Sequence, residues 1–251
     1  MDIIAKLAEP GAQLLGTWVK LSTLETMEML GHAGFDAVVI DTEHGSHGHE
    51  TVYRLIFAAQ AMGMAALVRV PDRSGSDIQR VLDAGADGIL VPRVQSLDEV
   101  RRVGRHAMHS PGGDRGLGST SRAGRWGMVP MADYIERGRS ATLRMIQLED
   151  WDALEQVEAV VDVTEINGIF LGLADLMLSS GKPPSDPAVQ ALVDRAFRAA
   201  TARGIPCGIA VGSGDEAKRY LDRGFKLVMV GNDCTMFGRA AAALVTSARG
   251  G

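Results

Sequence analysis

The segment 37–50, AVVIDTEHGSHGHE, brings together several side chains that are capable of chemistry. An apolar run leads directly into two acids and three of the chain's 6 histidines: Asp41, Glu43, His44, His47 and His49. Imidazole and carboxylate groups at this spacing suit a metal-binding cluster, or a catalytic base at the end of a strand. They are also compatible with a polar loop that is simply rich in histidine. Spacing alone leaves these three interpretations open.

Polar side chains also follow most of the other apolar runs in the chain. They are Arg69, Arg93, Gln147, Glu149, Asp175, Asn232 and Asp233. The beginnings of the same runs are comparatively bland. In a barrel of parallel strands the active site lies at the carboxyl ends of the strands. This one-sided distribution therefore predicts an enzyme.

The elements that must position these residues alternate between two patterns. Short apolar runs rich in β-branched residues alternate with longer stretches of helical period, which is typical of repeated strand–helix units and a parallel sheet. The predicted strands cover residues 14–19, 36–41, 65–70, 87–92, 142–147, 166–171, 206–210 and 226–231. The predicted helices cover residues 23–33, 50–62, 75–84, 96–108, 150–162, 187–203, 213–223 and 234–249.

Glycine marks the ends of several predicted helices, in HAGFD, AMGMA, DAGAD, ARGIP and DRGFK. Glycine takes the left-handed position that closes a helix at little energetic cost. Eight strand–helix units in 251 residues match the size of a (β/α)8 barrel. A doubly wound open sheet is the alternative, but no G-x-G-x-x-G follows the first strand. We therefore expect a single-domain α/β fold, a (β/α)8 TIM barrel over residues 1–251.

Composition excludes several classes of protein. The chain is 46% apolar and 23% charged with a net charge of −5, so neither nucleic acid nor an anionic membrane is an expected partner. No stretch approaches the roughly 20 apolar residues that span a bilayer, and the N-terminus lacks the pattern of a signal peptide. The cysteines, Cys207 and Cys234, are far apart and outside any C-x-x-C pattern. This usage indicates a cytoplasmic protein.

Glu149 and Asp175 follow adjacent predicted strands, so their carboxylates can converge on one point. Two carboxylates without cysteine form an oxygen-only site that suits Mg²⁺ or Mn²⁺, with water and substrate oxygens completing the coordination. The alternative is that each carboxylate caps the helix that begins beside it. Residue types and spacing leave both interpretations open.

Residues at the ends of the first and third predicted strands also have more than one interpretation. Arg69 ends a buried apolar strand, where a cation needs an anion. That anion is either a substrate oxygen or a carboxylate, Glu43 or Glu149. Trp18 is expected as a pocket wall or a core residue. Lys20 is the one lysine near the expected site and therefore the only candidate for a Schiff base.

The long irregular segment 109–130 contains three arginines among glycines and serines: Arg115, Arg122 and Arg125. Such loops can bind phosphate or carboxylate through backbone N–H groups and guanidinium groups, and they are as often simply exposed. A role for these arginines in binding an anion therefore stays open.

Motifs along most of the chain resemble those of a known family. They are, in order, GTWVK, AGFDAVVIDTEHG, VRVP, LDAGADGILVPRVQSLDE, RGLGS, RAGRW, QLED, GIFLGLADL and VGNDCTMF. Over about residues 11–245 the chain resembles the metal-dependent pyruvate aldolases of the HpcH/HpaI aldolase/citrate lyase family. The D-x-E-H and G-x-A-D-L motifs at this separation are fairly specific. The resemblance implies a (β/α)8 barrel assembled as a homohexamer, a trimer of dimers, with the C-terminal helix exchanged between subunits.

The resemblance also implies roles for individual residues. Glu149 and Asp175 are the implied ligands of a divalent metal ion, Mg²⁺, Mn²⁺ or Co²⁺. His44 is the implied catalytic base, oriented by Asp41, and Arg69 is implied to face the enolate oxygen. Backbone amides of residues 172–175 would hold the pyruvate carboxylate at a helix N-terminus. The implied substrate-binding residues are Gln147, Gly172, Leu173, Ala174, Trp18 and Arg122.

The implied reaction is the reversible cleavage of a 4-hydroxy-2-oxo acid to pyruvate and an aldehyde through a metal-stabilised enolate. Oxaloacetate decarboxylation, citrate-lyase-like cleavage and binding of a 2-oxo acid without turnover are the alternatives. The chain departs from the family in having Leu173 where proline is usual, and in the tail GSHGHE after His44. We expect His47 and His49 in this tail to be solvated or to cap the next helix, and to affect only aldehyde preference.

Overall fold

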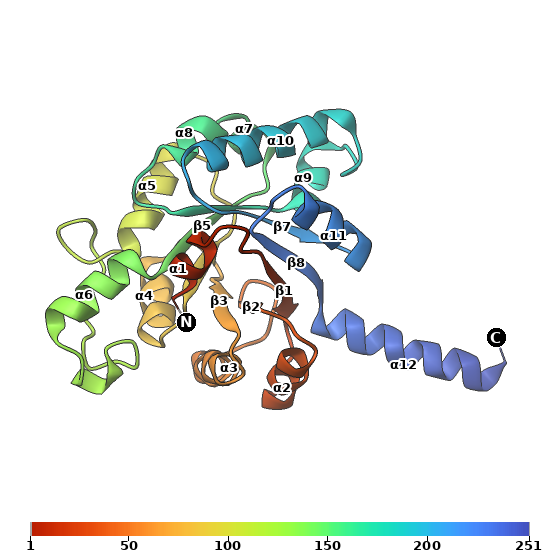
Figure 1. Ribbon diagram of the computed structural model, residues 1–251, viewed down its shortest axis with the longest axis horizontal. Coiled ribbons are helices and arrows are strands. Elements are labelled where there is room, and N and C mark those ends of the chain that lie inside the picture. Colours follow the sequence, from red (N-terminus) through yellow and green to blue (C-terminus); the bar gives the residue numbers. More distant parts are fainter. Residues whose placement is uncertain (1, 251) are drawn as a thin grey trace.

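Eight parallel strands close into a barrel in the computed structural model, which describes residues 2–250 (Figure 1). They are β1 (Leu14–Val19), β2 (Ala37–Asp41), β3 (Ala65–Arg69), β4 (Gly88–Val91), β5 (Leu143–Leu148), β6 (Gly168–Leu171), β7 (Cys207–Val211) and β8 (Leu227–Asn232). Each strand pairs with the next along the chain, and β8 pairs with β1. The predicted (β/α)8 barrel is confirmed, and all eight predicted strands are present.

Helices connect the strands. They are α1 (Ile3–Ala8), α2 (Leu24–His32), α3 (His49–Ala61), α4 (Gly75–Asp83), α5 (Leu97–His106), η1 (Arg125–Gly127), α6 (Met131–Ser140), α7 (Trp151–Glu155), α8 (Val157–Val161), α9 (Leu173–Ser180), α10 (Pro187–Ala202), α11 (Gly214–Asp222) and α12 (Asp233–Arg249). The segment 150–162, predicted as one helix, forms two helices, α7 and α8. They are separated at Gln156, whose backbone (φ −99°, ψ 16°) departs from helical geometry. The apolar pattern does not predict α6, in which Tyr134 is the buried residue.

The predicted glycine helix ends are confirmed. The five glycines all have positive φ: Gly34 (92°), Gly63 (79°), Gly85 (85°), Gly204 (67°) and Gly224 (94°). A residue with a side chain is strained in this region of backbone conformation. Each glycine therefore ends a helix and turns the chain toward the next strand.

Side chains alternate between two apolar clusters along each strand. On β2, Val38 and Ile40 pack beneath the helices, whereas Ala37 and Val39 fill the interior of the barrel. Ile3 and the rest of the apolar face of α1 join the interior cluster. This alternation follows from the two-residue period of a β-strand. The interior is thus a packed core rather than a channel.

The same period places polar groups in the last interior layer, at the carboxyl ends of the strands. On β2 the inward series continues from Val39 to Asp41, and on β3 it continues from Leu67 to Arg69. Asp41 and Arg69 are register partners on these neighbouring strands. β2 and β3 therefore present charged side chains at the carboxyl end of the barrel.

The C-terminal helix α12 extends away from the barrel beyond β8 (Figure 1). Among the described residues of this helix, Asp233 is the buried one. Phe237 and Leu244 are 73% and 74% exposed. Its own barrel therefore does not cover the apolar side chains of α12. No helix within residues 2–250 is both long enough and apolar enough to cross a membrane.

Candidate active site

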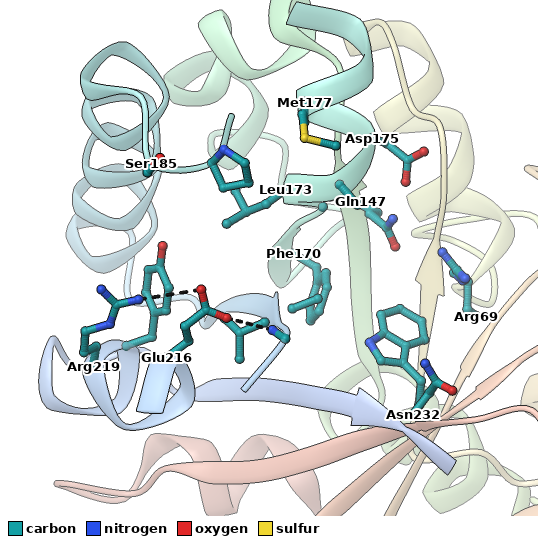
Figure 2. Close-up of a pocket in the computed structure, with 18 of the residues that line it drawn as sticks. Arg69, Gln147, Phe170, Leu173, Asp175, Met177, Ser185, Glu216, Arg219 and Asn232 are labelled. Carbon is teal, nitrogen blue, oxygen red and sulfur yellow. Dashed lines mark hydrogen bonds and ion pairs between the residues drawn. The ribbon is translucent and has the colours of Figure 1, made fainter. Parts of the chain in front are cut away.

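A cavity of about 800 Å³ opens at the carboxyl ends of the strands (Figure 2). The predicted residues that line it are Trp18, His44, Arg69, Gln147, Gly172, Leu173, Ala174 and Asp175. Figure 2 shows Arg69, Gln147 and Asp175 around one part of the cavity, with Phe170 and Leu173 between them and Arg219. The cavity therefore has an inner, polar half and an outer half formed by α9, α10 and α11.

Glu149 lies just beyond β5, and its side chain is buried. Its Oε1 accepts a hydrogen bond from the backbone N–H of Arg93 at 2.7 Å, and its Oε2 accepts one from the Gln147 amide. Burial raises the pKa of Glu149, and the carboxylates of Asp175 and Glu43 raise it further, against the opposing effect of the two donors. A buried carboxyl that faces other carboxylates is stabilised as an anion when a cation joins them.

The helix-capping interpretation does not hold for Glu149. The cap of α7 is the next residue, Asp150, whose Oδ1 accepts from the backbone N–H groups of Asp152 (3.1 Å) and Ala153 (3.3 Å). Asp175 lies in the first turn of α9, exposed at the cavity. Both carboxylates can therefore serve another purpose.

The donor set at this point fits a hard divalent cation. The oxygens come from two carboxylates, and Oε1 of Gln147 is buried without a hydrogen-bond partner among the described residues. Within residues 2–250, no three or more histidine, cysteine, aspartate or glutamate residues are grouped closely enough to hold a metal ion. The three histidines of segment 37–50 therefore do not form a ligand set. A two-carboxylate site needs its other ligands from substrate and water.

Gly172 brings the first turn of α9 against the cavity. A Cβ at this position would lie 2.9 Å from Cβ of Glu149 and 3.0 Å from Nε2 of Gln147, so the close approach requires glycine. Gly172 is also the N-cap of α9, where no side chain caps the helix within the described chain. Leu173 and Ala174 follow it along the cavity wall. An uncapped helix N-terminus favours an anion, such as a substrate carboxylate.

A chain of ion pairs crosses the ends of β1, β2 and β3. Nε and Nη2 of Arg69 donate to the two oxygens of Asp41 at 2.9 and 2.8 Å. Nη1 of Arg69 lies 3.0 Å from Glu43, whose other oxygen is 2.9 Å from Nε of Arg93. Nζ of Lys20 is 2.9 Å from Asp41. The salt bridge of Arg69 to Glu43, left open by the sequence, is confirmed, and Arg69 also lines the cavity.

Asp41 is fully buried, yet the chain of ion pairs keeps it ionised. Burial raises its pKa, but hydrogen bonds from Arg69 and Lys20 and the charge of Arg69 outweigh burial and hold the pKa well below its usual range. The ring of Trp18 lies 4.4 Å from the guanidinium carbon of Arg69, as a wall of the pocket. A Schiff base needs a free amine, so the ion pair of Lys20 disfavours that role.

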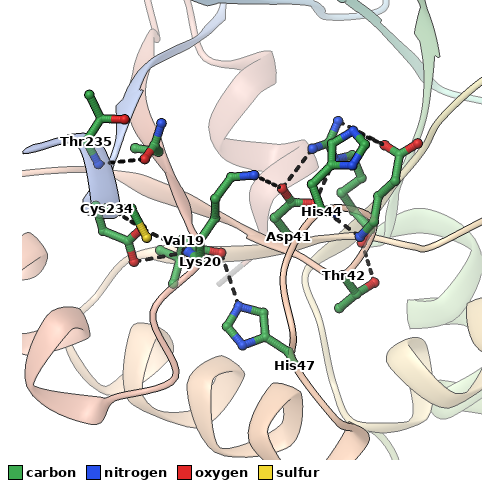
Figure 3. Close-up of polar contacts among 12 residues, drawn as sticks. Val19, Lys20, Asp41, Thr42, His44, His47, Cys234 and Thr235 are labelled. Carbon is green, nitrogen blue, oxygen red and sulfur yellow. Dashed lines mark hydrogen bonds and ion pairs between the residues drawn. The ribbon is translucent and has the colours of Figure 1, made fainter. Parts of the chain in front are cut away.

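His44 lines the cavity, and its side chain is 57% exposed. Figure 3 shows the polar contacts around His44 and Asp41. The predicted orientation of this imidazole by Asp41 is wrong. Oδ1 of Asp41 accepts from the backbone N–H of His44 at 3.2 Å, while the imidazole Nε2 lies 3.8 Å from Glu43. The reason is that Arg69 and Lys20 occupy the Asp41 carboxylate. Asp41 instead fixes the turn that carries His44.

The other two histidines of the segment are held away from the cavity. Nδ1 of His47 lies 3.0 Å from Oγ of Ser22, and Nε2 lies 3.3 Å from the carbonyl oxygen of Val19. His49 begins α3, where its Nε2 is 2.9 Å from Nη1 of Arg80. Neither histidine lines the cavity. The tail GSHGHE therefore contributes no histidine to the lining of the cavity in the described chain.

Arg122, which the resemblance implies to bind substrate, does not line the cavity of its own chain. Its guanidinium donates to the carbonyl oxygen of Ala84 at 3.0 Å and to Oε1 of Gln60 at 2.6 Å. Ala84 is the C-cap of α4, in the turn that leads to β4. The segment 109–130 follows α5 and so returns to the amino ends of the strands, opposite the mouth. Arg122 could meet a substrate only in a neighbouring subunit.

Sequence reasoning missed the outer wall of the cavity. Glu216, Arg219, Tyr220 and Arg223, from α11 and its C-cap, line this half. They are spaced as i, i+3, i+4 and i+7, so they share one face of the helix. That spacing is the signal that the sequence carries for them, but any amphipathic helix has the same spacing. The pairing of Lys20 with Asp41 has no comparable signal, because it joins separate strands.

The fold and the cavity together are those of an enzyme whose active site lies at the carboxyl end of a barrel. Residues 14–240 match the model of the HpcH/HpaI aldolase/citrate lyase family, and the chain belongs to this family. It is 35% identical over 237 residues to 4-hydroxy-2-oxo-heptane-1,7-dioate aldolase of Escherichia coli, covering 93% of this chain and 90% of that protein.

Solved structures agree with this assignment. An HpcH/HpaI aldolase/citrate lyase family protein from Burkholderia cenocepacia J2315 has a TM-score of 0.89 and 28% identity, covering 99% of both chains. The citrate synthase SbnG has a TM-score of 0.85 and 26% identity, covering 95% of this chain and 94% of that chain. The protein is therefore a carbon–carbon lyase of the aldolase type.

Proposed function

We propose that this enzyme catalyses the reversible cleavage of 4-hydroxy-2-oxo acids to pyruvate and an aldehyde. The observation that supports this most directly is the meeting of three features at one cavity. They are the guanidinium of Arg69, the uncapped start of α9, and the carboxylate of Asp175, with the buried Glu149 carboxylate next to the lining residues Gln147 and Gly172. A 2-oxo acid presents a carboxylate and an oxygen that becomes negatively charged, and these features are complementary to both groups.

Glu149 and Asp175 would hold a divalent metal ion, Mg²⁺, Mn²⁺ or Co²⁺. When bound, the ion supplies a Lewis acid that stabilises negative charge on the 2-oxo oxygen. The pKa of Glu149, raised by burial and by its carboxylate neighbours, supports this assignment. The unpartnered Oε1 of buried Gln147 is a further oxygen beside the two carboxylates.

The protein's own groups bind the substrate and move a proton. The first turn of α9 holds the substrate carboxylate, beside Gln147. His44 accepts the proton of the 4-hydroxyl group while the C3–C4 bond breaks. The electron pair of that bond forms the C2=C3 bond of the enolate, and the π pair of the 2-oxo group moves onto its oxygen. Arg69 faces this oxygen and stabilises its charge. Return of the proton to C3 then gives pyruvate. The aldehyde portion occupies the outer half of the cavity, beyond Phe170.

The proposed activity can be tested in the direction of synthesis. Metal-loaded enzyme is incubated with pyruvate and a panel of short, acidic, hydroxylated and aromatic aldehydes, and products are identified by mass spectrometry. We expect 4-hydroxy-2-oxo acids from at least one class of aldehyde. Absence of carbon–carbon bond formation with every class, while pyruvate binds tightly, would instead support a protein that binds 2-oxo acids without turnover.

Oxaloacetate decarboxylation or a citrate-lyase-like cleavage is the second candidate. The similarity to the citrate synthase SbnG over nearly the whole chain favours its consideration. Oxaloacetate, like pyruvate, carries a carboxylate next to an oxo group, so the inner half of the cavity would bind either. Release of CO₂ from oxaloacetate faster than turnover of 4-hydroxy-2-oxo acids would assign the decarboxylase activity.

Arg69→Ala is expected to lower kcat by roughly 10²–10³-fold, as the loss of an oxyanion-hole donor does. The guanidinium interacts more strongly with the charged enolate oxygen than with the neutral oxo group. Lysine should restore little, because Arg69 holds Asp41 and Glu43 with three nitrogens. Steady-state kinetics check this, with Arg54→Ala on the exposed face of α3 as control. An increase in KM alone would reassign Arg69 to ground-state binding.

We propose a homo-oligomer, a hexamer, in which α12 packs on a neighbouring subunit. The exposed apolar side chains of this helix support the proposal. Phe237→Glu with Leu244→Glu is expected to dissociate the oligomer, since each change places a charge on a surface that becomes buried. Light scattering measures the mass of both forms. A wild-type protein that is monomeric and active at working concentration would contradict the exchange of α12.

We infer that the enzyme works in the cytoplasm. Cys207 and Cys234 are both free thiols. Thiols that stay unpaired are usual in a reducing compartment. A fractionation experiment with the native protein would test this location.

A further inference from the structure

Lys20 is fixed at the cavity by contacts at its backbone and at its side chain. Its backbone N–H lies 2.9 and 3.0 Å from the two carboxylate oxygens of Asp233, and the N–H of Leu21 donates to the same carboxylate at 2.9 Å. Asp233 is 5% exposed, so this clamp is buried. At the other end, Nζ lies 2.9 Å from Asp41 (Figure 3). The ammonium group therefore lines the same cavity as Arg69.

The charge of the Asp41 carboxylate is already balanced by Arg69, without Lys20. Arg69 donates to both of its oxygens in a two-pronged pair. A buried carboxylate needs compensation by one cation, and Arg69 supplies it. Glu43 takes a further nitrogen of Arg69 and is itself paired with Arg93. The ion-pair chain therefore contains three cations and two carboxylates, and Lys20 is the member that makes it net positive.

We propose that Lys20 is a positioning residue of the aldol reaction. Through Asp41 it keeps the Arg69 guanidinium aligned with the enolate oxygen, and its charge makes the group of ion pairs net positive. This inference rests on the proposed aldol function. Without Lys20, the charges of Arg69 and Arg93 would be balanced by the carboxylates of Asp41 and Glu43. The group of ion pairs would then have no net charge. Charges in a partly buried site interact more strongly than charges in water. Removal of the Lys20 charge therefore weakens the stabilisation of the negatively charged enolate.

Exchange of pyruvate methyl protons for deuterium tests this directly, because it reports enolate formation without an aldehyde. Mass spectrometry follows the exchange in D₂O with Mn²⁺-loaded enzyme. Lys20→Gln keeps a hydrogen-bond donor near Asp41 and removes the charge, whereas Lys20→Arg keeps both. Lys218→Gln removes an exposed lysine that pairs with Asp222 and serves as control.

We expect Lys20→Gln to lower kcat for exchange about 10- to 100-fold with a much smaller change in KM, since the charge acts on the transition state. Lys20→Arg should restore most of the rate, and Lys218→Gln should match the wild type. A wild-type kcat in Lys20→Gln, with or without a lower Tm, would overturn the proposal. So would a Lys20→Arg variant as slow as Lys20→Gln. Wild-type enzyme that exchanges no protons would instead overturn the proposed function itself.

Discussion

Glu149→Gln is expected to lose turnover by at least about 10³-fold, together with divalent metal binding, while the protein stays folded. In the wild type the backbone N–H of Arg93 donates to Oε1 of Glu149 at 2.7 Å. Glutamine keeps an oxygen that can accept this hydrogen bond, but it removes the negative charge. Asp175→Asn should have the same effect, and its side chain is exposed, so the fold does not depend on it. Calorimetric titration with Mn²⁺, cleavage kinetics and circular dichroism measure the three quantities.

Asp150→Asn is the matched control for this prediction. Asp150 is the neighbour of Glu149 in sequence, but it caps α7 and does not line the cavity. We expect unchanged metal affinity and at most the loss of about 1 kcal/mol of stability that weakening an N-cap causes. Full activity of EDTA-treated, metal-free protein would contradict the metal site. Trapping of a pyruvate adduct on Lys20 by borohydride would then identify a Schiff-base enzyme.

The barrel is predictable from the sequence because its signals are local. Each strand is a short apolar run, and glycines such as Gly85 (φ 85°) mark the helix ends within a few residues of the next strand. Alternation with a period of two then determines which side chains enter the interior. The position of Asp41 and Arg69 in the last interior layer follows from these signals alone.

The partners of those side chains are not predictable in the same way, because they depend on register between strands. Asp41 and Arg69 are paired across β2 and β3, a relation that neither segment contains by itself. The sequence therefore left Arg69 with several possible anions. Asp41 was also expected to orient the imidazole of His44, which is close to it in sequence. In the structure the Asp41 carboxylate pairs with Arg69 and Lys20 instead.

Arg122 shows a second limit of the sequence. Guanidinium groups among glycines predict anion binding wherever the loop lies. Only the topology tells that a loop after a helix returns to the amino ends of the strands, where Arg122 meets Ala84 and Gln60. The outer wall of the cavity was missed because its local signal is not specific. Its members on α11 look like an ordinary amphipathic helix until the cavity beside them is known.

His44→Ala is expected to slow both aldol cleavage and pyruvate proton exchange by orders of magnitude, about 10²–10⁴-fold, while metal binding is retained. Its imidazole lines the cavity and is exposed to solvent, so it can exchange protons with substrate and water. An imidazole has one nitrogen that can accept a proton and one that can donate it, which suits removal and return of a proton. Its backbone N–H, held by Asp41 at 3.2 Å, keeps the turn in place without the side chain.

His47→Ala and His49→Ala are the matched comparisons, because all three histidines lie within six residues of one another. The structure holds His47 against Ser22 and Val19 and holds His49 against Arg80, away from the cavity. We expect both variants to stay within about tenfold of the wild type, since neither imidazole reaches the substrate. Loss of metal by all three variants would identify a histidine ligand set, and His44 would then not be the base. Loss of turnover by His44→Ala alone, with metal bound, separates proton transfer from metal binding in this site.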